Sequence, residues 1–290
     1  MMTNLEAAAR RLVGHARPVV GARGLLRPAL LALIIWFMAA GTAGADDPAK
    51  EFWPEIDTWL KLSPAWRLSL FVPISTNLET DYREGNLILQ CDYAFGQSNR
   101  MRAVRLLDEG RAGRMKTFLF RTGYLGGKSL DDKGQTYSEN SILAELHLRT
   151  PLKGGMLLSS RLRADLRWLG DTRAFSARWR FRAMVEKEIP AGRTSVVPYF
   201  SVEPYYDSRY ETVNRVRLIP GASVSWTERF AVEGNMTYQY DSHSSATHLV
   251  AVNVILHVFF DTSHLSPTDR VSAMRRGGDA GRVQPHRPVR

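Results

Sequence analysis

The sequence is poor in cysteine and has no apolar run long enough for a membrane helix. Cys91 is the single cysteine in 290 residues, which excludes an internal disulfide and a metal site built from cysteines alone. Hydrophobic residues make up 44% of the chain, and no convincing helix of three turns appears after residue 45. A bundle of membrane helices is therefore excluded.

Sequence motifs for cofactors are missing as well. The chain has no glycine-rich phosphate loop and no dinucleotide fingerprint. His243, His248 and His257 do not share one strand face at the spacing of metal ligands. We therefore expect neither a cofactor nor a metal site.

The basic charge is concentrated in the two ends of the chain. The net charge is +10, yet residues 1–45 carry five arginines against one glutamate, and residues 263–290 carry six arginines against two aspartates. The long segment between them is close to neutral. This distribution argues against a nucleic-acid surface on the body of the protein.

The basic N-terminal segment has the layout of a secretory leader. Five arginines precede the apolar run 29–40, and small residues ending in Ala43-Gly44-Ala45 follow. A membrane anchor would need about 20 apolar residues, so we predict a signal peptide over residues 1–45. The folded body is then expected over 46–262. The Arg-, Gly- and Pro-rich segment 263–290 is predicted to be a flexible basic tail.

Residues 156–186 show the pattern on which the fold prediction rests. Leu162 and Leu166 fall on one face of an extended chain, and Arg161 and Arg163 on the other. After a short LGDT turn the alternation resumes, with three more arginines on the polar face. A period of two predicts a long β-hairpin with one apolar and one ionic side.

The rest of the body repeats this pattern. Turn residues separate twelve candidate strands, at 51–62, 65–75, 86–95, 101–107, 115–125, 136–150, 156–168, 175–186, 195–207, 211–226, 231–241 and 248–260. Most are long enough for the 9–11 residues that a membrane-spanning strand needs, and aromatic residues gather near the ends of the apolar faces. The prediction is an all-β, closed antiparallel transmembrane β-barrel of about 12 strands with a polar, salt-bridged lumen. Pro198, Pro204 and Pro220 fall inside strands, so bulges or strand ends are expected there.

Several stretches resemble a bacterial family described only as domain of unknown function 2490. They are the opening Phe52-Trp53-Pro54-Glu55-Ile56-Asp57 with Leu62-Ser63-Pro64 and Arg67, the arginine-rich Arg161-Leu-Arg163 and Arg178-Trp-Arg180-Phe-Arg182, and Glu203-Pro204-Tyr205-Tyr206. The resemblance implies an outer-membrane β-barrel without an assigned activity. It supplies no catalytic residues.

The polar faces of the strands carry the candidate functional residues. Nearly equal numbers of cations and anions would face one another across a modest lumen. The predicted ionic network comprises Glu145, His147, Arg149, Arg161, Arg163, Asp165, Arg167, Arg178, Arg180, Arg182, Glu186, Glu203, Asp207, Arg215, Arg217, Glu233 and Asp241. Such a network can simply brace the barrel, or it can line a narrow pore that favours anions.

We therefore predict a monomeric outer-membrane barrel of structural or passive-transport type, without enzymatic activity, in a Gram-negative envelope. Its expected partners are outer-membrane lipids and, during biogenesis, the barrel-assembly machinery, with no nucleic acid. One alternative is a phospholipase-like lipid-modifying enzyme, in which His243, Ser245 and Asn253 would supply the chemistry. The other is a soluble periplasmic binding barrel, in which the apolar faces would be buried.

Overall fold

The computed structural model describes residues 48–102, 114–131, 137–170, 174–191, 194–227, 229–244 and 247–262. The predicted signal peptide and the predicted basic tail lie outside these residues. Within them the chain consists of strands and short turns, with a single turn of 3-10 helix, η1, at Lys153–Gly155. No helix in this part of the chain is both long and apolar enough to cross a membrane.

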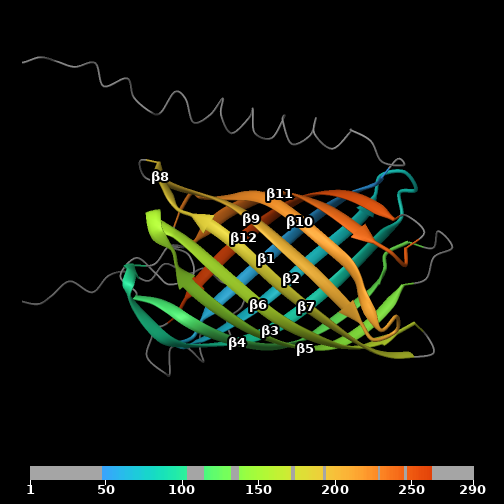
Figure 1. Ribbon diagram of the computed structural model, residues 1–290, viewed down its shortest axis with the longest axis horizontal. Coiled ribbons are helices and arrows are strands. Elements are labelled where there is room, and N and C mark those ends of the chain that lie inside the picture. Colours follow the sequence, from blue (N-terminus) through green and yellow to red (C-terminus); the bar gives the residue numbers. More distant parts are fainter. Residues whose placement is uncertain are drawn as a thin grey trace, which may run out of the picture. The chain divides into compact units, whose positions relative to one another are not determined.

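Twelve strands follow one another along the described part of the chain. They are β1 (Ala49–Lys61), β2 (Trp66–Asn77), β3 (Arg83–Arg102), β4 (Arg114–Ser129), β5 (Ser138–Pro151), β6 (Met156–Leu169), β7 (Ala174–Lys187), β8 (Ile189–Ala191), β9 (Thr194–Asp207), β10 (Thr212–Ser225), β11 (Phe230–Asp241) and β12 (His248–Asp261). All except the three-residue β8 have at least 12 residues. At about 3.3 Å per residue they can cross a hydrocarbon layer while strongly tilted, as Figure 1 shows.

Eleven of these strands close into a barrel. Successive strands pair antiparallel from β1 to β7 and from β9 to β12, β7 pairs with β9, and β8 is an extra strand on β9. The ring is closed by β1 and β12, which run parallel from Ala49 opposite Leu249 to Lys61 opposite Asp261. An odd number of strands requires such a pair, because the first and last strands then point in the same direction.

The prediction of a closed β-barrel of about 12 strands is confirmed: eleven strands form the ring and β8 is the twelfth, although the β1–β12 pair is parallel where every pair was expected to be antiparallel. Segments 86–95 and 101–107 were predicted as two strands joined by a GQSN turn. The structure instead continues β3 without a break through Gly96, whose φ of 69° lies in the left-handed region that glycine tolerates. The chain therefore does not reverse at this glycine, and the register of β3 with β4 shifts between Gln97 and Arg102. Residues 103–107 lie outside the described part.

The prolines disturb the sheet less than predicted. Pro198 and Pro220 lie opposite Ala222 and Phe200 with no register shift at either position, so the expected bulges are absent there. A shift does occur between Val213 and Arg215, opposite Tyr206 and Tyr205 and thus next to Pro204. Each proline removes one donor from the ladder, but the long flanking pairings hold the register.

The outer surface of the barrel is apolar. Trp179, Phe181 and Val254 are 47%, 48% and 44% exposed, whereas the side chain of Arg180 is only 12% exposed and faces inward to Asp165. The most buried residues are mostly polar or charged. An ordinary soluble barrel has the opposite arrangement, so the fold is that of an outer-membrane-type β-barrel.

Candidate functional site

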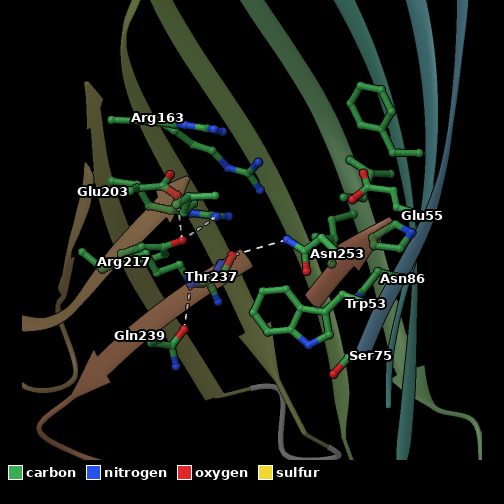
Figure 2. A pocket seen from close by; sticks show the side chains of 18 of the residues that line it. Trp53, Glu55, Ser75, Asn86, Arg163, Glu203, Arg217, Thr237, Gln239 and Asn253 are labelled. Atoms are coloured by element: carbon green, nitrogen blue, oxygen red, sulfur yellow. Dashed lines mark hydrogen bonds between the residues drawn. The ribbon is translucent and has the colours of Figure 1, made fainter. Parts of the chain in front are cut away.

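A cavity of about 910 Å³ lies inside the barrel and is lined by residues from most of its strands. All of the predicted network residues line it except Asp165 and Asp241, and these two carboxylates pair with arginines that do. They share the inward side because residues two apart on a strand point the same way. Figure 2 shows Arg163, Glu203 and Arg217 on one side of this cavity and Trp53 and Glu55 on another.

Seven arginines of β6, β7 and β10 form what we refer to as the basic wall: Arg161, Arg163, Arg178, Arg180, Arg182, Arg215 and Arg217. Four carboxylates form ion pairs with members of this wall, namely Glu145, Asp165, Glu203 and Asp241. Among the described residues, the wall therefore holds more cations than the carboxylates that form these ion pairs with it.

Asp165 is the most heavily shared carboxylate of the basic wall. Its oxygens accept hydrogen bonds from Nε of Arg163 at 2.5 Å, Nε of Arg180 at 2.9 Å and Nε of Arg178 at 3.2 Å. The Asp165 side chain is 1% exposed. One buried anion thus holds together arginines of the neighbouring strands β6 and β7, where arginines lie directly opposite one another.

A second shared carboxylate, Glu145 of β5, joins the basic wall to β4. It accepts hydrogen bonds from Arg163 Nη1 at 3.0 Å and Arg121 Nη1 at 3.3 Å, and its Oε2 lies 2.8 Å from His147 Nε2. Arg121 also pairs with Asp92, which in turn pairs with Arg67.

The prediction from sequence missed the ion pairs on β2 to β4. Asp92 and Arg121 lie directly opposite each other on β3 and β4. Both were embedded in segments that read as mainly apolar. Asp92 shares its strand parity with Gln90, which was the signal available for an inward-facing position.

Tyr205 of β9 lies among four arginines of the basic wall. The guanidinium carbons of Arg178, Arg180, Arg215 and Arg217 are 5.1 to 5.8 Å from its ring centroid. Its hydroxyl donates a hydrogen bond to Glu203 Oε2 at 3.0 Å. The ring is 1% exposed, so its electron-rich faces help to hold like charges close together.

Two arginines of the basic wall have no carboxylate within ion-pair distance among the described residues. Arg182 donates to Ser201 Oγ at 3.2 Å and contacts Met184 Sδ. Arg217 donates from Nε to Gln239 Oε1 at 2.7 Å and lies over the Trp53 ring at 5.0 Å. Both residues line the cavity, and a small anion there could accept hydrogen bonds from their remaining N–H groups.

Carboxylates of β1, β3 and β11 line another side of the cavity, and we refer to them as the acidic wall: Glu51, Glu55, Asp57, Glu84 and Glu233. His257 bridges two of them, with Nδ1 at 3.2 Å from Asp57 and Nε2 at 3.4 Å from Glu233. Tyr199 also donates a hydrogen bond to Glu233. The prediction from sequence included only Glu233, because the strand at residues 51–62 was read for its family resemblance and not for its inward face.

The end of the barrel near β5 carries a further charged group. Arg167 pairs with Glu139 at 2.8 Å and with Asp207 at 3.4 Å. Tyr137, just before β5, donates to Glu139 at 3.1 Å. Burial, reinforced by the charge of Glu139, raises the pKa of Tyr137 above its ordinary value, so its hydroxyl remains a donor. The hydrogen bond to Asp207 raises the pKa of Arg209 in the adjoining turn.

The residues of the phospholipase-like alternative do not form one site in the described part of the chain. His243 lies in the turn after β11, where it contacts Ser242 and stacks on Tyr210 at 4.1 Å. Asn253 instead donates to Asn235 and Thr237 inside the lumen. Ser245 lies outside the described residues.

The fold and the lumen define the chain as a β-barrel of outer-membrane type with a charged interior. The family model for DUF2490, a protein family of unknown function, matches residues 114–249. This confirms the resemblance seen in the arginine-rich strands and in the segment 203–206, although the stretch beginning at Phe52 lies before the matched region. No curated protein matches the sequence.

A solved structure with a similar fold is LpxR from Salmonella typhimurium. The similarity covers 70% of this chain and 87% of LpxR, with 8% sequence identity and a TM-score of 0.43. LpxR is a lipid-modifying enzyme, and the prediction from the sequence that this chain has no enzymatic activity is withdrawn. The low identity and TM-score transfer no activity or site residue from LpxR to this chain.

Proposed function

We propose that this chain is exported to the outer membrane of a Gram-negative cell and that its lumen admits small solutes with a preference for anions. The observation that carries the proposal is the pair Arg182 and Arg217, which border the cavity without carboxylate partners among the described residues. Rings and clusters of arginine favour anions in narrow pores. The apolar outer surface supports placement in a membrane.

A passing anion can also bind to the basic wall without displacing the carboxylates that already pair with its arginines. Its other arginines are engaged with Asp165, Glu145, Glu203 or Asp241, and these pairs hold the wall in place. The ion pairs fix the positions of the arginines, and only part of the positive charge of the wall is left to attract an anion. Such a site can bind an anion weakly enough to release it.

Ion selectivity in planar bilayers tests this proposal. We expect the folded protein to conduct in 0.1 M salt and to pass chloride in preference to potassium, as judged from the reversal potential across a salt gradient. The double change Arg182→Gln and Arg217→Gln should lower the anion-to-cation permeability ratio roughly tenfold, because two unit charges close to the ion path are lost.

The matched control is Arg229→Gln, which removes an arginine from the exposed turn between β10 and β11 and should leave the ratio unchanged. Heat-modifiable migration on gels shows that each variant is folded. Absence of any current from folded protein would remove passage through the lumen from the proposal, and an unchanged ratio in the double variant would remove the two arginines.

A further inference from the structure

The charges of the lumen are sorted by sign. The basic wall of β6, β7 and β10 holds seven arginines against four paired carboxylates. In the acidic wall of β1, β3 and β11, Glu51, Glu55 and Glu84 have no arginine or lysine within ion-pair distance among the described residues. The two surpluses of opposite sign border the same cavity, so a field runs across it.

The two walls come close together at Trp53. The guanidinium carbon of Arg217 lies 5.0 Å from the centroid of the Trp53 ring. Glu55 follows two residues later on the same inward face of β1, about 7 Å further along the strand. Figure 2 shows Trp53 and Glu55 on one side of the cavity and Arg217 and Glu203 facing them. One small molecule can therefore contact both walls.

One buried carboxylate oxygen of the acidic wall, Oδ1 of Asp57, accepts no hydrogen bond. Asp57 is 7% exposed, and its Oδ2 pairs with His257, but its Oδ1 has no hydrogen-bond partner. The neighbouring carboxyl of Glu55 lies within hydrogen-bond reach of Asp57 and also interacts with the charge of Glu233, and it can donate to Asp57 only if it holds a proton. His257 already bridges Asp57 and Glu233, and a cationic group beside Glu55 and Asp57 would satisfy the remaining acceptor and stabilise the carboxyl of Glu55 in its charged form.

The basic wall presents the complementary requirement. Arg182 and Arg217 both lie near Glu203, yet neither forms an ion pair with it, and the buried Nε of Arg161 has no partner. A simple anion is attracted by the basic wall alone, and a simple cation by the acidic wall alone. A solute with both charges is attracted by each wall at its own end.

We propose that the solute class of the lumen is a small zwitterion, with an ammonium group held by Glu55 and Asp57 and a carboxylate, sulfonate or phosphate group held by Arg182 and Arg217. This inference rests on the proposed function only in that the lumen admits small solutes. It adds the acidic wall as the second half of the site and requires the two charges of the solute to be several bonds apart.

Calorimetric titration of the folded protein in detergent at 0.1 M salt tests the inference with three probes of equal chain length. They are 6-aminohexanoate, which carries both charges, hexanoate and hexylammonium. We expect the dissociation constant of 6-aminohexanoate to be at least tenfold lower than that of either singly charged probe, because each charged end gains charge-assisted hydrogen bonds.

Two variants assign the ends of the solute. Glu55→Gln should weaken 6-aminohexanoate to the level of hexanoate while leaving hexanoate binding intact, and Arg217→Gln should weaken both 6-aminohexanoate and hexanoate. Glu79→Gln, in an exposed turn, is the matched control for the glutamate change and Arg229→Gln for the arginine change. Heat-modifiable migration again establishes folding.

Equal binding of hexanoate and 6-aminohexanoate would overturn the inference, as would a failure of all three probes to bind. Because binding is measured without a membrane, these outcomes are separate from conductance. Anion current without a preference for 6-aminohexanoate contradicts the zwitterion alone, and preferential binding of 6-aminohexanoate without current contradicts passage alone.

Discussion

At the scale of single residues, the lumen is organised by a few carboxylates that each serve several arginines. Asp165 accepts from three guanidinium groups and Glu145 from two. A buried charge is tolerated only when its hydrogen bonds are met, so each shared carboxylate sets the positions of the arginines around it. The surplus of cations at Arg182 and Arg217 exists because these shared anions hold the rest of the wall together.

The exchange Asp165→Asn is expected to destabilise the barrel by about 3–5 kcal/mol, because it leaves three buried arginines without their common anion. Urea unfolding in detergent or lipid vesicles measures the loss. Asp261→Asn is the control, since Asp261 pairs with Lys61 on the exposed surface, where an ion pair contributes up to about 1 kcal/mol. Equal effects of the two changes would contradict the bracing role of Asp165.

At the same scale, the sequence predicted toward which face of the sheet a side chain points, but it did not predict which residues that side chain contacts. Strand parity alone placed Arg161, Arg163 and Arg180 on one face, and they line the cavity. The meeting of Arg121 with Asp92, or of Arg217 with Trp53, could not be read from sequence. Those contacts depend on which strands become neighbours and how far a long side chain reaches.

At the scale of elements, small residues on inward faces make room for large ones on neighbouring strands. A Cβ atom at Gly221 of β10 would lie 2.5 Å from the Tyr199 ring and 2.6 Å from Cβ of Asn235. Tyr199 passes over this glycine from β9 to reach Glu233 on β11. The glycine thereby allows a hydrogen bond that spans the strand between them.

Gly221→Ala is expected to destabilise the barrel by about 1–3 kcal/mol through overpacking and to disturb the bond from Tyr199 to Glu233. Gly234→Ala on the adjacent strand is the matched control, because a Cβ there meets nothing within 4 Å, and it should be neutral or slightly stabilising. The same unfolding measurement compares the two. Equal changes in the free energy of unfolding for the two variants would show that the close packing of Tyr199 over Gly221 does not require a glycine at this position.

The difference at GQSN, where one strand replaces the two that were predicted, also belongs to this scale. The turn-forming residues GQSN predicted a hairpin. Such residues show only that the chain can reverse direction at this point, and they do not require it to do so. In the structure β3 continues and pairs with β4 well before this point, from Glu84 opposite Ser129 to Phe95 opposite Phe118. The long pairing with β4 outweighs the local turn preference.

At the scale of the whole molecule, the parallel seam between β1 and β12 has a consequence for orientation. Because the first and last strands point the same way, the start of β1 and the end of β12 lie at opposite ends of the barrel. An even-stranded, fully antiparallel barrel would put both at one end.

Single cysteines in a Cys91→Ser background test this topology. Pro48→Cys and Asp261→Cys should react with a membrane-impermeant maleimide from opposite sides of the outer membrane in whole cells. Lys153→Cys in η1 should react from the same side as Asp261→Cys, since β5 and β6 turn at the end of the barrel where β12 finishes. Reaction of Pro48→Cys and Asp261→Cys from the same side would contradict the eleven-strand closure.

The sequence by itself determined most of the strands, their alternation and the inward face of the arginines on β6 and β7, because a period of two is a local property of the extended backbone. Only the tertiary structure decided how many strands close the ring, the parallel seam and the sorting of arginines and carboxylates onto separate walls. These depend on which strands pair and in what register. That choice joins residues as distant as Trp53 and Arg217, and it depends on the closure of the whole ring.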